Sequence, residues 1–161
     1  MRYLISICIL FSIMAICGCE EIQQTASDYP SGKIKGGCLF SPQRIKFNQL
    51  TELTQSLQIT AFIDVFDQFD SRIKASSVWR FELYEKALRS ADAMGSRIRI
   101  WSDIELTEAK INQDHWRDYL HCYEFQLNLE SELPGGKTYI LQAVCFTADG
   151  RRITDIIELK S

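Results

Sequence analysis

Two segments of the chain alternate apolar and polar side chains with a period of two. Residues 78–85 place Trp79, Phe81 and Leu83 on one side, and residues 123–129 alternate without a break. Because successive side chains of a β-strand point to opposite faces, this period predicts two half-buried strands. We predict that four large apolar side chains on these strands are buried and face one another between two sheets: Trp79, Phe81, Phe125 and Leu127.

Other segments have the composition of strands and are separated by turn formers. The run 138–146 is almost continuously apolar or β-branched, which is typical of a central strand. Asp149-Gly150 predicts a hairpin turn into a strand at 152–159. Further strands are predicted at 58–65 and 97–101.

These strands indicate an all-β domain over 44–161, because no βαβ alternation is present. We predict a two-sheet antiparallel sandwich of about seven strands. Its pattern resembles the immunoglobulin-like and transthyretin-like sandwiches in architecture, without matching a specific family. A short helical turn is predicted within 105–120, with Asn112 or Asp114 as its N-cap, and 86–94 is a second segment with helical spacing.

The N-terminus has the pattern of a secretory signal. Arg2 is followed by an almost wholly apolar run at 3–17, and Gly18 supplies the small residue that a signal peptidase needs. A membrane span needs about 20 apolar residues, and Glu20 ends the run first. We therefore predict a signal peptide over residues 1–18.

The segment Ile16-Cys17-Gly18-Cys19 resembles the lipobox of bacterial lipoproteins. This resemblance implies cleavage before Cys19, acylation of Cys19 with chains such as palmitate, and a place in the bacterial cell envelope, anchored in a membrane and facing the periplasm or the exterior. Cys17 is the weaker candidate because the bulky Ile16 precedes it. Glu20 in place of Asp favours the outer membrane by the same resemblance.

Residues 19–43 are predicted to be a flexible tether. They are rich in turn formers and have no apolar period. A segment of about 24 residues has a root-mean-square reach of roughly 25–30 Å. This length can hold a domain clear of the lipid head groups.

The net charge limits which partners are expected, and the number of cysteines limits how many disulfides can form. The chain carries 18 basic and 21 acidic side chains, a net charge of −3, which argues against a nucleic-acid partner. Membrane attachment is therefore expected through lipid on Cys19. Cys38, Cys122 and Cys145 remain in the mature chain, so either one disulfide forms or the thiols are buried and free.

No motif of a catalytic or cofactor site is present. The chain lacks G-x-S-x-G, H-E-x-x-H, P-loop and C-x-x-C patterns, so we expect no enzyme activity and no cofactor. His121 and Cys122 are neighbours, and on a strand they would point to opposite faces.

Two acidic clusters are also interpreted without a metal. Asp64, Asp67 and Asp70 surround a turn, and Asp is a default turn former. A second group is interpreted as polar surface beside a helical turn, and we expect no metal there either: Asp114, His115, Asp118 and His121.

The stretch 101–118 holds the candidate binding residues, because it lies outside the clearest strands and loops often carry function. The main hypothesis is a non-catalytic lipid-anchored envelope protein whose sandwich binds another envelope protein. One alternative is a carbohydrate or small-molecule module that uses Trp101 and Trp116, and another is a hydrolase around His115 and Asp118. For Trp116 a purely structural role, closing the open end of the sandwich, is the competing interpretation. The candidate binding residues are Trp101, His115, Trp116, Arg117 and Asp118.

The lipid anchor is directly testable. We expect Cys19→Ser to give an uncleaved or a soluble exported product, because the acylated residue is lost. The intact mass of the native protein should include acyl chains on Cys19. A mature protein that begins at another residue and carries no lipid would contradict the anchor.

Overall fold

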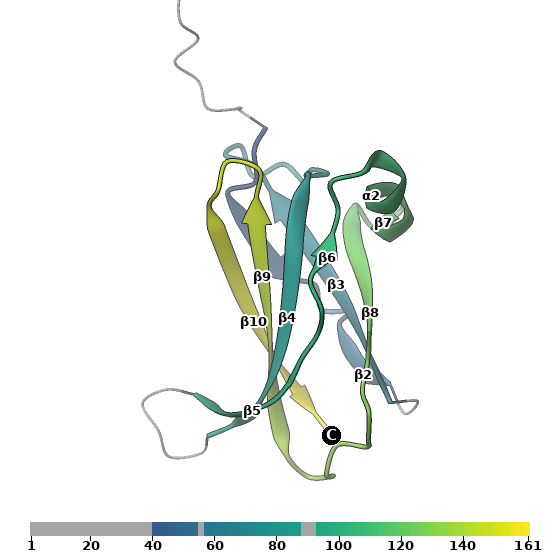
Figure 1. The fold of residues 1–161 in the computed structure, drawn as a ribbon, viewed down its shortest axis with the longest axis vertical. Helices are drawn as coiled ribbons and strands as arrows, with labels where there is room; N and C mark the ends of the chain where they lie inside the picture. Colours follow the sequence, from purple (N-terminus) through teal and green to yellow (C-terminus); the bar gives the residue numbers. More distant parts are fainter. Residues whose placement is uncertain (1–39, 55–56, 88–92) are drawn as a thin grey trace, which may run out of the picture. The chain divides into compact units, whose positions relative to one another are not determined.

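The computed structural model describes residues 40–54, 57–87 and 93–161. Its strands form two antiparallel sheets of five strands each, and the sheets pack face to face (Figure 1). The predicted all-β, two-sheet antiparallel sandwich is therefore confirmed. The described residues form ten strands instead of about seven, because four of them are short, with two to four residues, and have no periodic signal in the sequence.

Sheet A is built around β3 (Gln58–Phe66). On one side β3 pairs with β8 (Cys122–Asn128), and on the other it pairs with β1 (Arg44–Phe47) and β2 (Glu52–Thr54). The two-residue strand β7 (Trp116–Arg117) adds to the start of β8. All of these pairings are antiparallel.

Sheet B has the order β10, β9, β4, β5. The long strands β10 (Arg152–Lys160), β9 (Thr138–Thr147) and β4 (Ser77–Lys86) pair along almost their whole lengths. Strand β5 (Met94–Ile100) pairs irregularly with one half of β4, and β6 (Ile104–Glu105) pairs with the other half. The predicted central position of the 138–146 strand is confirmed, since β9 lies between β10 and β4.

The single helix of the described residues, α2 (Ala109–His115), lies within the predicted 105–120 segment. Its N-cap is Glu108, so the prediction of Asn112 or Asp114 as the N-cap is wrong. Asn112 instead turns its side chain into the sandwich, where its Oδ1 accepts a hydrogen bond of 2.8 Å from the hydroxyl of Tyr123. Burial raises the pKa of that hydroxyl, which keeps it a proton donor.

Several predictions concern residues outside the described ranges. The signal peptide 1–18, Cys19, Cys38 and most of the tether belong to this group. In the 86–94 segment, β4 ends at Lys86 and β5 begins at Met94, while residues 88–92 lie outside the description. Among the residues that are described, no helix is long and apolar enough to cross a bilayer.

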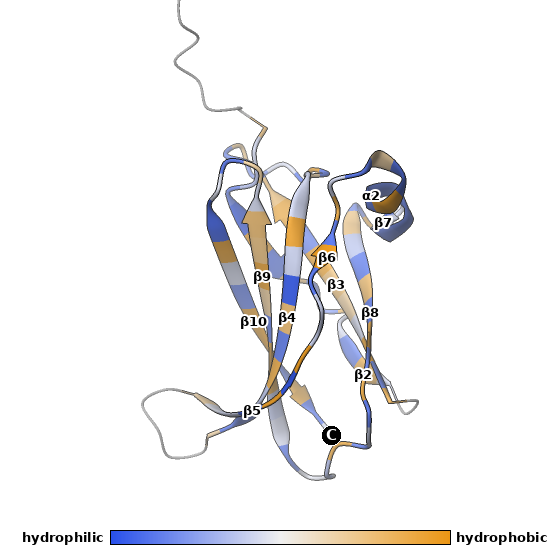
Figure 2. Ribbon diagram, in the orientation of Figure 1, coloured by the Kyte–Doolittle hydropathy of each residue, from blue (hydrophilic) through white to orange (hydrophobic). Residues whose placement is uncertain are grey.

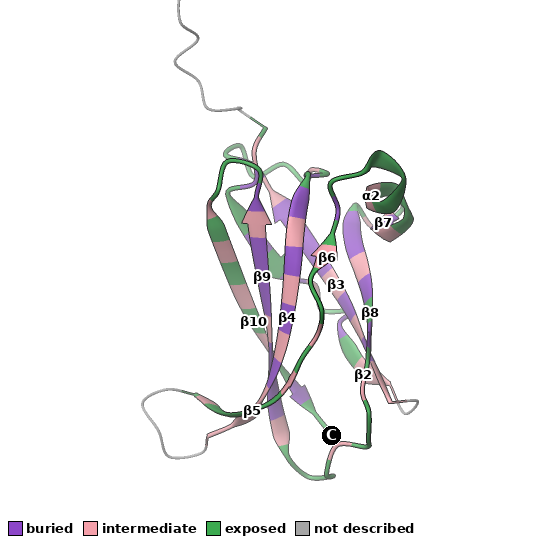
Figure 3. Ribbon diagram, in the orientation of Figure 1, coloured by how far each residue is buried: buried purple, intermediate pink, exposed green. Residues whose placement is uncertain are grey.

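The core lies where β4 and β8 face each other across the two sheets. Figure 2 shows the alternating hydropathy along these strands, and Figure 3 shows the matching alternation of burial. The ring centroid of Phe125 lies 5.2 Å from that of Trp79 and 4.9 Å from that of Phe81, within the range of favourable aromatic pairs. The predicted burial of four residues is confirmed: Trp79, Phe81, Phe125 and Leu127.

Polar side chains complete the hydrogen bonding at the edges of sheet A and sheet B. The Asp155 carboxylate points inward from β10 and accepts a hydrogen bond of 2.7 Å from the Phe47 N–H on β1. The Thr51 hydroxyl binds both the N–H and the carbonyl of Phe62, where β1 and β2 are interrupted. Inward charges and interrupted edge strands protect a sheet from pairing with other chains.

The core assignment predicts a large loss of stability for Phe125→Ala. Removing a fully buried ring should lower the free energy of unfolding by about 3–5 kcal/mol. The exposed neighbour on the same strand provides the control, because Gln126→Ala should change it by at most about 0.5 kcal/mol. Denaturant unfolding of the two variants measures the difference, and equal stabilities would contradict the packing described here.

Candidate functional site

The two ends of the sandwich differ in the side chains that line their hollows. We call the end that carries residues 40–43, the 67–72 turn and α2 the proximal end (Figure 1). The opposite end, where segment 129–137 joins β8 to β9 and where β10 finishes, is the distal end. Both ends carry hollows: one beside α2 and one beside Phe40 at the proximal end, and one at the distal end. The distal hollow differs in having four leucines in its walls.

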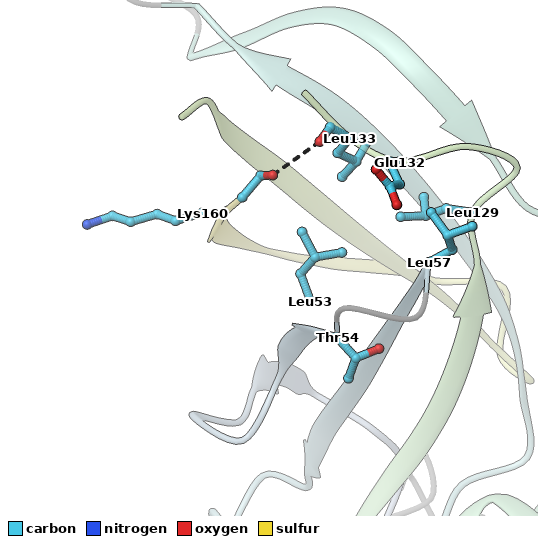
Figure 4. Close-up of a pocket in the computed structure, with 8 residues that line it drawn as sticks. Leu53, Thr54, Leu57, Leu129, Glu132, Leu133 and Lys160 are labelled. Atoms are coloured by element: carbon cyan, nitrogen blue, oxygen red, sulfur yellow. Dashed lines mark hydrogen bonds between the residues drawn. The ribbon is translucent and has the colours of Figure 1, made fainter. Parts of the chain in front are cut away.

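The distal pocket has a volume of about 360 Å³ and is open to solvent. Its walls combine four leucines with four polar residues, and Figure 4 shows the leucine side chains around a common space. The Lys160 ammonium group points away from this space in the same view. The residues that line the pocket are Leu53, Thr54, Leu57, Leu129, Glu132, Leu133, Lys160 and Ser161.

Strand ends from both sheets position these walls. Leu53 belongs to β2, and the N–H of Leu129 donates a hydrogen bond of 2.7 Å to the carbonyl of Leu57, which joins the end of β8 to the start of β3. The Ser161 hydroxyl donates to the Leu133 carbonyl at 3.2 Å. Leu53, Leu129 and Leu133 also pack against the core, so the pocket is a continuation of the core that solvent can reach.

Leu57 has an unfavourable backbone conformation. Its φ of 57° lies in the left-handed region, where Asp70 and His121 are the other described residues that are not glycine. Asp and His adopt this region more readily than leucine, for which it costs about 1–2 kcal/mol. Backbone strain of this kind is concentrated at functional sites. The strained leucine therefore marks the pocket wall as the best candidate for a functional surface.

The two candidate tryptophans lie at opposite ends of β8. Trp116 is only 6% exposed and packs edge-on against Tyr123 with ring centroids 5.0 Å apart. The indole of Trp101 donates a hydrogen bond of 2.8 Å to the carbonyl of Asn128, the last residue of β8. The structure thus does not bring these two rings together, and Trp116 has the position expected of a residue that closes the proximal end.

The other three candidates form hydrogen bonds within the domain. His115 Nδ1 lies 3.0 Å from the Glu124 carbonyl, and because a carbonyl only accepts, this nitrogen carries the proton. The Arg117 guanidinium binds the Glu124 carboxylate at 2.6 Å. Asp118 is exposed and lies 3.4 Å from the Lys74 ammonium. His115 and Arg117 therefore meet at Glu124, and Asp118 has a different partner.

Trp101 and His115 share a structural role that the sequence does not reveal. Strand β7 pairs with only the first two residues of β8, and no other described segment pairs with the rest of that edge as a strand. The side chains of Trp101 and His115 bind the carbonyls of Asn128 and Glu124 along this edge. Both side chains therefore occupy backbone hydrogen-bonding groups on an edge of β8 that could otherwise pair with a strand of another chain.

The two described cysteines are buried free thiols. Burial raises the pKa of both the Cys122 and the Cys145 thiol to about 11, so both are protonated at neutral pH. His121 lies in the turn before β8 with a φ of 52°, so it does not share a strand with Cys122. Cys38, which belongs to the predicted tether, lies outside the described ranges.

The acidic residues around the 67–71 turn have separate partners. The Asp67 carboxylate accepts hydrogen bonds from the Phe69 and Ser71 N–H groups at 2.8 and 3.0 Å, which is the expected behaviour of a turn former. Asp64 and Asp70 form ion pairs with two different arginines. Within the described part of the chain, no group of three or more His, Cys, Asp or Glu side chains is placed to hold a metal ion.

The distal pocket was not predicted from the sequence. Its leucines come from separate segments: Leu53 is the middle residue of β2, Leu57 precedes β3, and Leu129 and Leu133 follow β8. No local pattern links these segments, so no sequence signal specifies the pocket. No protein-family model matches the chain, and no curated protein is significantly similar to it.

The thiol environment predicts a dependence of stability on alkaline pH. In the unfolded chain the thiols ionise near their ordinary pKa of about 9, whereas in the folded chain they ionise near 11. The thiol contribution to stability is therefore complete below pH 9 and is lost as the pH rises through 11. Denaturant unfolding of the mature chain at pH 8, 10 and 11 should show this fall.

The matched control is the double variant Cys122→Ala/Cys145→Ala, in which the fall in stability over the same pH range should be smaller. In a Cys38→Ser background, the two native thiols should also react slowly with a thiol reagent at pH 8 and rapidly after unfolding. Equal rates in the folded and unfolded protein would contradict their burial.

Proposed function

We propose that this chain is a non-catalytic lipoprotein of the bacterial cell envelope, anchored by acyl chains on Cys19, whose sandwich binds another envelope protein at its distal end. The observation that carries this proposal is the leucine-lined distal pocket with the strained Leu57 in its wall. The signal and lipobox pattern at residues 1–19 supports the anchor.

The size and chemistry of the pocket favour an apolar side chain of a protein segment as the occupant. A volume of about 360 Å³ is near the lower limit for small-molecule sites and suits a single anchoring side chain. Protein interfaces concentrate their affinity in such anchors, which fill pockets at the centre of the contact. Polar groups of Glu132 and Ser161 beside the leucines can bind the backbone on either side of the inserted residue.

The position of the pocket is consistent with an anchored protein. The described chain begins with Phe40 at the proximal end, and the pocket opens at the distal end. An anchor on Cys19 therefore holds the sandwich by the end that is remote from the pocket. A partner can then reach the leucines without displacing the tether.

The contacts of the remaining candidate residues favour this proposal over the two alternatives. A carbohydrate module would need an open aromatic face, but Trp116 is buried and the Trp101 indole is hydrogen-bonded to β8. A hydrolase around His115 and Asp118 would need the two side chains to cooperate. His115 instead contacts a backbone carbonyl and Asp118 contacts Lys74.

The test is site-specific photo-crosslinking in native membranes from Ser131, an exposed residue beside the pocket that does not line it. We expect one protein adduct when all residues that line the pocket are unchanged. Leu57→Asn should reduce the adduct by about tenfold, because a polar side chain replaces an apolar wall. The fold should remain as stable or become more stable, since asparagine tolerates the left-handed region better than leucine.

Leu50→Asn is the matched control, because Leu50 is an exposed leucine in the turn between β1 and β2 and does not line the pocket. Its adduct should equal that of the unmodified protein. The proposed binding surface would be overturned if both variants crosslinked equally well or if no protein adduct formed. If a small molecule copurified with the unmodified protein and was lost in Leu57→Asn, the pocket would instead be a small-molecule site, as in the alternative hypothesis.

A further inference from the structure

Two phenylalanine rings are exposed side by side at the proximal end. Phe40 is 64% exposed and Phe69 is 60% exposed, and their ring centroids lie 6.4 Å apart. They come from distant parts of the chain and meet because the 67–71 turn lies beside the segment that leads into β1. Large apolar groups gathered on a surface mark a contact with a partner or a membrane. We call this pair the phenylalanine patch.

The segment that carries Phe40 is fixed to the sandwich. The Arg151 guanidinium donates hydrogen bonds of 2.8 Å to the Pro42 carbonyl and 2.7 Å to the Gln43 side chain. Hydrogen bonds from Arg151 and Thr147 lower the pKa of the Asp149 carboxyl to about 2, so Asp149 stays charged and orients Arg151. The last residues of the predicted 19–43 tether are therefore part of the domain, and they hold the phenylalanine patch in a defined position.

Charged side chains of both signs lie around the phenylalanine patch. Arg44 lies over the Phe66 ring at 4.0 Å and pairs with Asp70, and Lys74 lines a hollow of about 260 Å³ beside Phe40. The side chains of Arg44 and Lys74 are 48% and 42% exposed. Because Asp70 and Asp118 pair with these two cations, the surface is close to neutral, and its apolar rings are its dominant feature.

We propose that the proximal end is a lipid-facing surface whose phenylalanine patch inserts into the interface of the bilayer that holds the lipid on Cys19. The proposal rests on the proposed anchor, because the anchor brings this end to the membrane. The chain between Cys19 and Phe40 is about 20 residues long and ends on the patch itself. Exposed aromatic rings are typical of surfaces that lie in the membrane interface.

Because the proposed anchor keeps the phenylalanine patch close to the membrane, a weak affinity of the patch for lipid is sufficient to hold it there. A surface that is confined within a few tens of ångströms of its target has an effective concentration in the millimolar range. Insertion of the two rings would hold the proximal end on the lipid and would direct the distal pocket away from the membrane. The patch thus specifies the orientation in which the pocket meets its partner.

The test uses the mature chain with Cys19→Ser, which has no acyl group and retains the whole core between Ile45 and Leu159. Its binding to vesicles of phosphatidylethanolamine and phosphatidylglycerol is measured by flotation. Phe40→Ser/Phe69→Ser should reduce the partition coefficient at least about tenfold. Ile98→Ser/Ile156→Ser, which removes two exposed isoleucines from sheet B, is the matched control and should bind like the parent.

A second measurement does not depend on removing the rings. A tryptophan at Phe69→Trp should be quenched by brominated phospholipid, whereas a tryptophan at Ile156→Trp should not. The lipid-facing surface is overturned if the parent does not bind vesicles, if the phenylalanine variant binds equally well, or if neither tryptophan is quenched. Loss of the protein adduct in the phenylalanine variant with unchanged vesicle binding would make the patch a protein-binding surface instead. These results leave the anchor intact, since only a native mass without acyl chains would overturn it.

Discussion

The packing of Phe125 between Trp79 and Phe81 is the contact on which the rest of the domain depends. These rings belong to opposite sheets, and their tilted arrangement fixes the separation and the angle between β4 and β8. Because protein interiors are close-packed, loss of one of these rings would leave a gap between the sheets. Beyond this central contact, the ends of the sandwich are covered by α2, by short strands and by connecting segments.

The two ends of the sandwich carry different side chains, and this difference is the basis for the different roles proposed for them. At the proximal end, Trp116 and Asn112 join α2 and β7 to Tyr123, and two exposed phenylalanines lie on the surface. At the distal end, four leucines line a pocket that is open to solvent. We propose that the exposed rings face the membrane and that the leucine-lined pocket faces a partner.

The period of two was sufficient to predict the sandwich and its central residues, because burial of Phe81 and Phe125 requires nothing beyond local alternation. The alternation did not predict burial correctly where contacts between distant segments determine which side chains are exposed. The same alternation at 97–101 suggests a buried face, yet Ile98 and Ile100 are exposed. Ile100 lies opposite Glu82, which alternates with the buried residues of β4 and is therefore on the solvent face, and Ile98 lies at the register shift between β5 and β4. The edge-covering role of His115 and the distal pocket depend on segments that meet only in the folded chain, so no local pattern specifies them.

The orientation of the sandwich on the membrane is the central claim, and energy transfer to a lipid-borne acceptor tests it most directly. Donor fluorophores are placed at the exposed position 68, next to the phenylalanine patch, or at position 132 at the distal end, in the acylated protein in vesicles. The proposed orientation predicts efficient transfer from position 68 and weak transfer from position 132, because it puts the phenylalanine patch on the lipid and the distal pocket away from it. Equal transfer from both positions, or stronger transfer from position 132, would contradict this orientation.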